Sequence, residues 1–534
     1  MKMLNKTLTI GLILSLLSLH VLAQIPRIVE KDGRHALLVD GKPFFILGGQ
    51  AHNSSGWPGM MPELFSAVKT MHLNTVEIPI YWEQVEAKPG KFNFSLVDTL
   101  LAQARAHQVR LVILWFGTWK NGSNHYMPEW MKREAAKYPN ITGSKGQAID
   151  SPSPIAKTTL EADIKAFTQV MHHLKQADPQ HTVIMVQVEN EAGAWGSVRD
   201  YSPAAQKLFQ AAVPPQLLQP EVLNSLNVPV VASGTWQQVF GDRADEYFQA
   251  WYVASFIGKV AAAGKAEYPL PMYVNCALRE PFSNPTADTY ESGGPTDNVI
   301  PIWKAAAPVI DLLAPDIYLQ GSKKILKVIE LYDRPNNALF VPEAALSFAN
   351  AKYLYEVIGR GGIGFSPFGI DANVPEGQPA ETSERLAPFS RDYVVIAPMI
   401  RVLSEWAFEG KIKTAIERED HAEQTIDVGT WKAVVSFGST RANADQVNRE
   451  PNGKIMIVQL DTNKFILIGS LCHITFQPAR QHTGSAWQYL KVEEGNYENG
   501  IFKPLRILNG DETDFGGPRF GAGPIVLQAE LITR

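Results

Sequence analysis

Residues 182–191 read TVIMVQVENE, an apolar run rich in β-branched side chains that ends in Glu189-Asn190-Glu191. Such a run is typical of a strand that is buried on both faces. In a parallel α/β barrel the catalytic side chains follow the carboxyl ends of the strands. This stretch therefore predicts a barrel strand that delivers a carboxylate into a site. The alternative is an ordinary buried strand that enters a polar loop.

Strand-like and helix-like segments alternate on both sides of this stretch. Further strands are expected at residues 44–48, 74–80, 109–116, 272–277, 312–318, 339–343 and 364–368. Helical spacing of apolar residues is found at residues 62–71, 96–104, 160–174, 245–263, 325–331 and 353–358. Residues 228–232 are strand-like, but we assign them to an insertion at residues 197–245. The alternation predicts an α/β fold, a (β/α)8 TIM barrel over residues 24–410.

The pattern changes near Gly410, where helical spacing gives way to short, often alternating strands. Asn, Asp and Gly turns separate these strands, as at residues 454–459 and 464–468. This is typical of an all-β module, and we expect a C-terminal β-sandwich domain over residues 411–534. A role in bracing the barrel is favoured over independent carbohydrate binding, because no exposed aromatic triad can be identified.

The chain begins with a segment that resembles a signal peptide, residues 1–23, with lysines before an apolar stretch and a small-residue cleavage site. We expect an exported protein, periplasmic or secreted, with no membrane anchor. The net charge of −5 over 534 residues gives no reason to expect a nucleic-acid partner. Cys276 and Cys472 are far apart, and their spacing indicates neither a metal site nor a disulfide.

Two strand ends offer a glutamate: Glu191, and Glu343 after residues 339–342. Closure of eight strands would turn both toward one pit. Two carboxyl groups about 5–5.5 Å apart are what a retaining glycosidase uses as acid/base and nucleophile. Carboxylates suffice for this chemistry, so no cofactor and no metal are expected. The adjacent His172 and His173 cannot face one ligand together, and no phosphate-binding glycine loop is present.

Aromatic residues gather after the second and third predicted strands. Flat apolar rings are the platforms on which sugars stack, and the alternative is that some of them belong to the core. These residues are Tyr81, Trp82, Trp115, Phe116, Trp119, Tyr126 and Trp130.

Several motifs together resemble glycoside hydrolase family 35, the β-galactosidases, within the clan A retaining barrel glycosidases. Residues 188–193, VENEAG, resemble the family signature V-E-N-E-Y-G. Residues 40–52, DGKPFFILGGQAH, resemble its first strand, and residues 73–94 resemble its second. Residues 127–131, MPEWM, are similar to the family's L-P-x-W-L. The chain is identified on these motifs as a divergent, bacterial member.

The resemblance implies roles for individual residues. Glu191 would be the acid/base and Glu343 the nucleophile, while Glu189 is interpreted as structural. Asn190 would bind the sugar 2-hydroxyl, and Tyr318 would hydrogen-bond the nucleophile. The further candidate substrate-binding residues are His52, Trp82, Trp115 and Trp119.

The implied function is a retaining, exo-acting β-galactosidase acting on oligosaccharides or plant polysaccharide side chains, with xyloglucan among the candidates. Three positions depart from the family pattern. The family's A-E-W reads Gly117-Thr118-Trp119 here, so Thr118 stands in place of the glutamate, Pro79 replaces a tyrosine, and Ala192 replaces the signature tyrosine. These departures keep open another retaining β-glycosidase or glucanase. A non-catalytic sugar-binding barrel is the third alternative.

Overall fold

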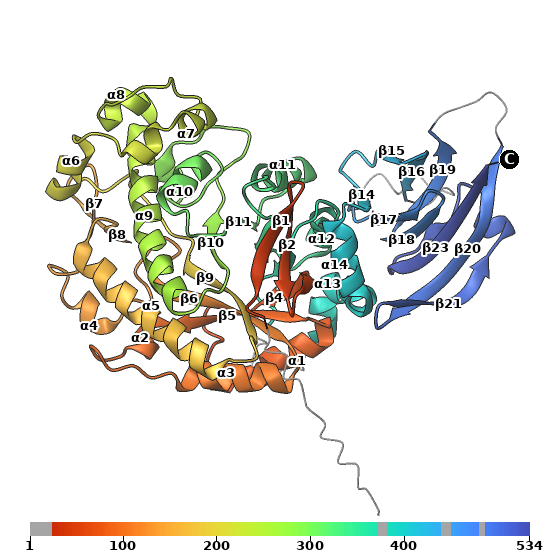
Figure 1. Cartoon of the computed structure of the whole chain (residues 1–534), viewed down its shortest axis with the longest axis horizontal. Coiled ribbons are helices and arrows are strands. Elements are labelled where there is room, and N and C mark those ends of the chain that lie inside the picture. The colour runs from red at the N-terminus through yellow and green to blue at the C-terminus, as the bar shows by residue number, and fades with distance from the viewer. Residues whose placement is uncertain (1–23, 372–381, 439–449, 480–485, 534) are drawn as a thin grey trace, which may run out of the picture.

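The computed structural model describes residues 24–371, 382–438, 450–479 and 486–533, and Figure 1 shows its two parts, a barrel and a C-terminal β-module. Eight parallel strands close the barrel, so the predicted TIM barrel is confirmed. In order around the barrel they are β4 (Ile46–Gln50), β5 (Thr75–Tyr81), β6 (Arg110–Lys120), β9 (Val183–Asn190), β10 (Met272–Ala277), β11 (Leu312–Ile317), β12 (Phe340–Ala344) and β13 (Gly364–Pro367).

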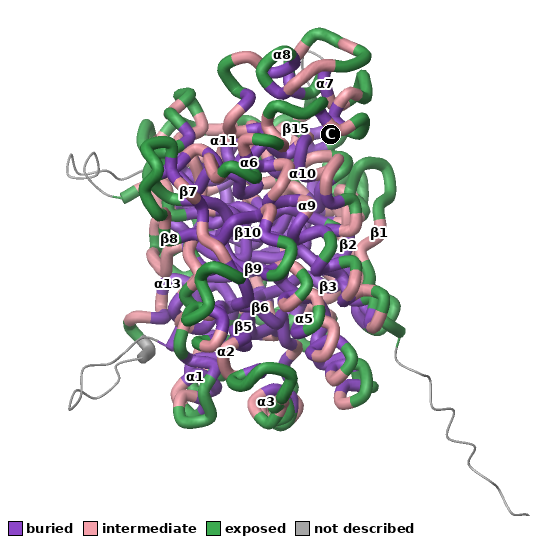
Figure 2. Tube along the Cα trace, turned by 90° about the vertical axis from the view of Figure 1, so that its left-hand side faces the viewer, coloured by how far each residue is buried: buried purple, intermediate pink, exposed green. Residues whose placement is uncertain are grey.

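Helices surround the strands because each crossover must bury an apolar stripe against the sheet. The main helices are α1 (Met61–Met71), α3 (Ser95–Ala106), α5 (Lys157–Ala177), α9 (Ala244–Glu267), α10 (Ile300–Ala306), α11 (Ser322–Tyr332), α12 (Phe348–Gly359), α13 (Thr382–Ile396) and α14 (Ile400–Phe408). Every residue of β5 and β9 is buried, and Figure 2 shows this buried centre around β5, β6, β9 and β10.

A small sheet lies against the amino-terminal end of the barrel. It comprises β1 (Arg27–Lys31), β2 (Arg34–Val39) and β3 (Lys42–Phe44). Leu37, Val39 and Phe44 from this sheet share a core with Val112 and Ile184 from the barrel strands. Packed side chains therefore fill this end of the barrel, which leaves the carboxyl ends of the strands for a site.

The insertion expected at residues 197–245 lies outside the barrel, as predicted. It forms short helices, α6 (Pro203–Phe209), α7 (Pro220–Ser225) and α8 (Trp236–Phe240). The strand-like residues 228–232 form no strand, and Val230 is 55% exposed. Pro229 follows Val228 there, and proline removes the N–H that a ladder requires.

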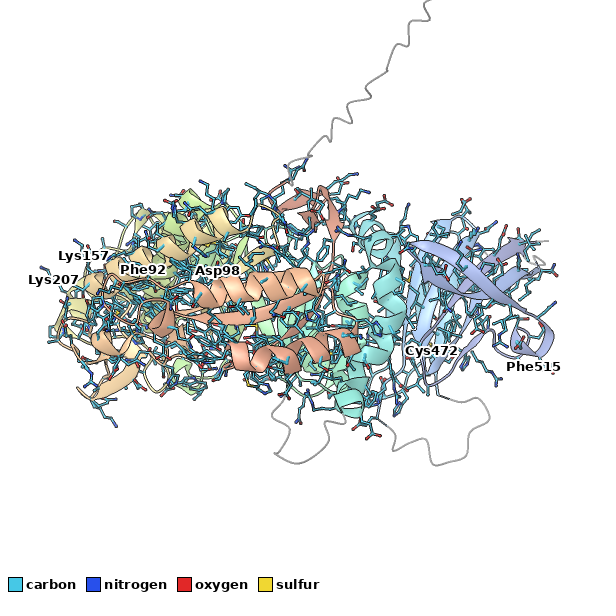
Figure 3. All side chains as sticks on the ribbon, turned by 90° about the horizontal axis from the view of Figure 1, so that it is seen from below. Phe92, Asp98, Lys157, Lys207, Cys472 and Phe515 are labelled. Carbon is cyan, nitrogen blue, oxygen red and sulfur yellow. The ribbon has the colours of Figure 1, made fainter. Side chains whose placement is uncertain are left out.

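The C-terminal module is all β, as expected. One sheet has the order β14 (Ile412–Ile416), β17 (Lys454–Asp461), β18 (Lys464–Ser470), β23 (Ile525–Thr533), β20 (Trp487–Glu498) and β21 (Ile501–Leu508). The second has the order β15 (Gln424–Val428), β16 (Trp431–Phe437), β19 (Cys472–Pro478) and β22 (Arg519–Phe520). The two sheets share one apolar core, and exposed Phe515 lies at the end of the module farthest from the barrel (Figure 3).

One face of the larger sheet packs on the barrel. Met456 and Ile466 of that sheet belong to the same apolar core as the barrel helices. The Nζ atom of Lys454 forms a buried ion pair with Asp392 of α13, at 2.6 Å. Lys352 of α12, the helix that follows β12, donates to two backbone carbonyls of the module. These contacts support the bracing role that we favour for the module.

The predicted signal peptide, residues 1–23, lies outside the described residues. Within the part of the chain that the structure describes, no helix is both long and apolar enough to span a bilayer. Cys276 and Cys472 are both free and buried, Cys276 in the barrel and Cys472 in the module.

Candidate active site

Three carboxyl groups meet at the carboxyl ends of the barrel strands. Glu191 directly follows β9, Asp316 lies in β11, and Glu343 lies in β12. One oxygen from each side chain lies within 4.8 Å of an oxygen from the other two. The exposed fractions are 7% for Glu191, 2% for Asp316 and 5% for Glu343, so the cluster is almost enclosed. The structure thus brings together the two glutamates that were predicted to meet.

Four donors surround the carboxylate of Glu343. Its Oε1 accepts from Gln50 Nε2 at 2.9 Å, and from Asn190 Nδ2 and Asn275 Nδ2 at 3.4 Å each. Its Oε2 accepts from the Tyr318 hydroxyl at 3.0 Å. These contacts come from four different strand ends, which fixes the carboxylate in one orientation. Asn190 and Tyr318 were expected here, whereas Gln50 and Asn275 were not.

The backbone turns sharply where β9 delivers Glu191. Both Glu189 and Glu191 have left-handed φ angles, of 65° and 43°, which side chains other than glycine rarely adopt. The Glu191 N–H donates to Asn275 Oδ1 at 2.9 Å, and its Oε2 accepts from the Asn121 side chain. Burial raises the pKa of Glu191 to about 7, and the charge of Glu343 adds to this effect. Glu191 is therefore suited to carry a proton near neutral pH.

Asp316 is the third carboxyl group of the cluster. Its Oδ2 accepts from Asn275 Nδ2 at 2.8 Å. Burial raises the pKa of Asp316 well above its usual range, and the charges of Glu343 and Glu191 raise it further. Like charges this close cannot all be ionised, so the cluster retains protons at neutral pH. Because amide donors already point at these oxygens, the cluster suits proton sharing better than cation binding.

Three tryptophans expected to bind sugar are core residues instead. Trp82, Trp115 and Trp119 are at most 1% exposed. The indole of Trp82 donates to Glu86 Oε2, and that of Trp115 donates to Asp163 Oδ1, both at 3.0 Å. They fill the space between strands and covering helices, where large rings bury the most apolar surface. The structure therefore corrects this expectation.

Other expected residues are where a ligand can reach them. Tyr318 is 47% exposed. The side chain of His52 is 38% exposed, with its Nδ1 atom 3.3 Å from Asp371 Oδ1. Glu189 is fully buried, and its Oε2 accepts from the backbone N–H of Trp119 at 2.7 Å, in keeping with a structural role.

Gly117 opens the segment Gly117-Thr118-Trp119 that stands in place of the family's A-E-W, and the structure leaves no space for a side chain at Gly117. A Cβ atom at this position would lie 2.3 Å from Trp115 Nε1 and 2.9 Å from Glu189 Oε1. We expect Gly117→Ala to lower the free energy of unfolding by about 1–3 kcal/mol, because the buried neighbours must shift. Urea denaturation measures this. Gly59→Ala, which would contact nothing within 4 Å, is the control, and equal stability of the two variants would contradict the packing described.

Several residues around the carboxyl groups were not identified from the sequence. Gln50, Asn275 and Asp316 are polar residues within buried strands, and that pattern was a usable signal. The others are loop residues or lie at a strand end, where the sequence does not indicate which side chains turn toward the carboxyl groups. They are Lys120, Asn121, Trp195 and Glu291.

Comparison with known proteins matches two parts of the chain. The family described as "Glycosyl hydrolases family 35" matches residues 36–137. A domain of unknown function, DUF5597, matches residues 389–517, which run from α13 into the C-terminal module. A β-galactosidase of Xanthomonas manihotis is 28% identical over 181 residues, which cover 32% of this chain and 28% of that protein. Beta-galactosidase 11 of Arabidopsis thaliana is 36% identical over 67 residues, 12% of this chain and 8% of that protein.

Among solved structures, the β-galactosidase of Bacillus circulans sp. alkalophilus aligns with a TM-score of 0.49 and 14% identity. The alignment covers 66% of this chain and 56% of that one. The matched segment spans less than a third of the length of the curated relatives. The expected resemblance is confirmed: residues 36–137, in the amino-terminal part of the barrel, match the model of family 35 glycoside hydrolases and are similar in sequence to β-galactosidases.

Proposed function

We propose that this protein is a retaining, exo-acting β-galactosidase. It would remove terminal β-galactose from oligosaccharides or plant polysaccharide side chains, with xyloglucan among the candidates. The observation that carries the proposal is the approach of Glu191 and Glu343 oxygens to within 4.8 Å. Retaining glycosidases hold their carboxyl groups about 5–5.5 Å apart, whereas inverting enzymes leave about 6.5–9.5 Å for a water molecule.

In the first step the Glu343 carboxylate attacks the anomeric carbon. The bond from that carbon to the leaving-group oxygen breaks, and the proton of Glu191 passes to this oxygen. A covalent glycosyl ester on Glu343 results. Asn190, whose amide lies 3.4 Å from Glu343 Oε1, is placed to bind the sugar hydroxyl next to the reacting carbon.

In the second step Glu191 acts as the base. Esterification removes the charge of Glu343, and that charge contributes to the raised pKa of Glu191. The pKa of Glu191 therefore falls after the first step, so its carboxylate can accept a proton from water. The water oxygen attacks the anomeric carbon, the ester bond breaks, and Glu343 is free again.

The enclosure of the two carboxyl groups supports exo action, because Glu191 is only 7% exposed and Glu343 only 5% exposed. An enclosed pair accommodates one terminal sugar more readily than the interior of a long chain. We also propose that the enzyme acts outside the cytoplasm, periplasmic or secreted, on the basis of residues 1–23. Fractionation of expressing cells with and without these residues tests that location.

A panel of nitrophenyl glycosides tests the activity. We expect the β-galactoside to have the highest kcat/KM, and free galactose to be the first product released from galactosylated oligosaccharides. Glu343→Gln is the matched control for contaminating activity. Release of internal fragments from a polysaccharide would favour a retaining glucanase instead, and the threonine at position 118, where the family has a glutamate, keeps that second candidate open. Sugar binding without turnover would contradict the proposal.

A further inference from the structure

An exposed indole stands beside the acid/base glutamate. Trp195 lies four residues after Glu191 and is 48% exposed, whereas five of the ten tryptophans of the barrel are buried. Its Nε1 atom donates to Glu291 Oε1 at 2.7 Å. A half-exposed aromatic ring held by a buried carboxylate is fixed in place before any ligand arrives, and this lowers the entropy lost on binding.

Glu291 is itself buried. It is 3% exposed, and its second oxygen has no hydrogen-bond partner among the described residues. The adjoining Ser292 forms two backbone hydrogen bonds with Ala194, of 2.9 and 3.1 Å, which tie this loop to the one that carries Trp195.

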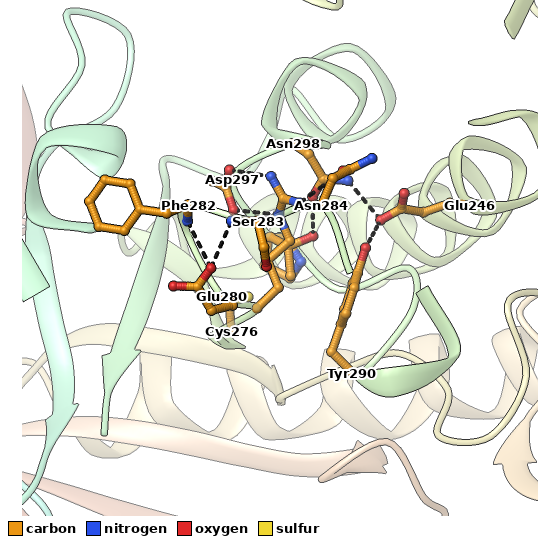
Figure 4. Close-up of polar contacts among 12 residues, drawn as sticks. Glu246, Cys276, Glu280, Phe282, Ser283, Asn284, Tyr290, Asp297 and Asn298 are labelled. Carbon is orange, nitrogen blue, oxygen red and sulfur yellow. Dashed lines mark hydrogen bonds and ion pairs between the residues drawn. The ribbon is translucent and has the colours of Figure 1, made fainter. Parts of the chain in front are cut away.

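The loop that carries Glu291 is anchored at both ends. Arg279 forms two hydrogen bonds with Asp297, at 2.7 and 2.8 Å. Glu246 of α9 accepts from the Tyr290 hydroxyl and, at 2.8 Å, from Asn298 Nδ2, as Figure 4 shows. Charged and amide contacts at both ends restrict the motion of the loop, so Glu291 can act as a rigid support.

The loop after β6 contacts both Glu191 and the Trp195 indole. The Asn121 side chain donates to Glu191 Oε2, and the Gly122 N–H donates to the Glu191 carbonyl at 2.9 Å. A Cβ atom on Gly122 would lie 2.9 Å from Trp195 Cδ1. The indole therefore lies against Gly122, one of the two residues that hydrogen-bond Glu191.

We propose that Trp195 is the platform on which the leaving-group sugar stacks, and that Glu291 is the positioning residue that holds it. This rests on the proposed function, because an acid/base glutamate donates its proton to the leaving-group oxygen. Whatever departs must therefore lie beside the Glu191 carboxyl group. The ligand of this subsite is a neutral pyranose, which offers an apolar face to the ring and hydroxyl groups to neighbouring polar atoms.

Two substrates that carry the same galactosyl group but different leaving groups distinguish binding of the leaving-group sugar from an effect on the chemical step itself. β-Galactosyl fluoride has a leaving group of one atom, which cannot contact Trp195, whereas a galactosyl disaccharide places a sugar there. We expect Trp195→Ala to lower kcat/KM for the disaccharide about tenfold or more, and to leave that for the fluoride within about threefold. Galactosyl transfer from the fluoride to an added acceptor sugar should fall by a similar factor.

Further variants sharpen the result. Trp195→Phe keeps a ring without the indole N–H, and we expect a loss intermediate between wild type and Trp195→Ala. Glu291→Ala should reproduce part of the loss with the disaccharide but not with the fluoride. Phe515→Ala, an exposed aromatic change on the module far from the barrel, is the control and should change neither.

Equal effects of Trp195→Ala on both donors, or no effect on either, would overturn the subsite while leaving the proposed function intact. Failure of the wild-type protein to hydrolyse both donors would instead overturn the proposed function, and the subsite with it.

Discussion

Glu343→Gly is expected to lower kcat/KM for galactosides by at least about 10⁴-fold, the largest loss of any single change in this barrel. The variant removes the atom that attacks the anomeric carbon, and a one-step reaction with water must replace two easier steps. Its four partners, Gln50, Asn190, Asn275 and Tyr318, remain. Steady-state kinetics with a nitrophenyl galactoside measures the loss.

Azide provides the positive control for this variant. Glycine leaves a space where the carboxylate stood, so a small anion can enter and attack the anomeric carbon from the same face. With an activated galactoside and azide we expect recovered turnover and the α-galactosyl azide as product. Activity of Glu343→Gly within about 100-fold of wild type, in protein shown to be folded by circular dichroism, would contradict the assigned nucleophile.

Glu191→Ala is expected to have the second largest effect, and its size should depend on the leaving group. A sugar departs poorly without a proton, so kcat/KM for a disaccharide should fall about 10³-fold or more. A dinitrophenyl group departs without protonation, and its release in the first step should be nearly unchanged. Hydrolysis of the resulting ester is then slow, because no base activates water, so a pre-steady-state burst of dinitrophenolate should appear.

The pH profile provides a second readout for Glu191. The acid must be protonated in the free enzyme, so kcat/KM should fall as pH rises through the Glu191 pKa of about 7, by about tenfold per unit. Glu191→Ala should lose this alkaline limb. An unchanged limb, or a disaccharide and a dinitrophenyl galactoside affected equally in the first step, would show that another residue is the acid.

The barrel could be predicted from sequence because its strands are buried on both faces. A strand such as β9 is mainly apolar until it leaves the core, so residues 182–191 indicate both the strand and its polar end. The ends of β9 and β12 were enough to predict that Glu191 and Glu343 meet, because closure of the barrel determines which side chains face one another. The boundary between the barrel and the C-terminal module near Gly410 could likewise be predicted, because the helical spacing of apolar residues ends there.

Exposure of the aromatic residues could not be predicted in the same way. Trp115 lies in the middle of β6 and is fully buried, whereas Trp195 follows the end of β9 and is 48% exposed. The difference depends on tertiary contacts. A helix covers Trp115, and its residue Asp163 accepts a hydrogen bond from the indole; a loop supports Trp195, and its residue Glu291 accepts from that indole. Asp163 and Glu291 are distant in sequence from the tryptophans that they contact, so tertiary packing rather than the local sequence pattern determines which ring is exposed.

The stereochemistry of the first product tests most directly whether Glu191 and Glu343 act on opposite sides of one anomeric carbon. Proton NMR of a β-galactoside during the first minutes of hydrolysis distinguishes the two anomers before they interconvert. Because the two carboxyl groups lie too close to admit a water between sugar and nucleophile, we predict that β-galactose appears first. Initial formation of α-galactose would contradict this account of the site.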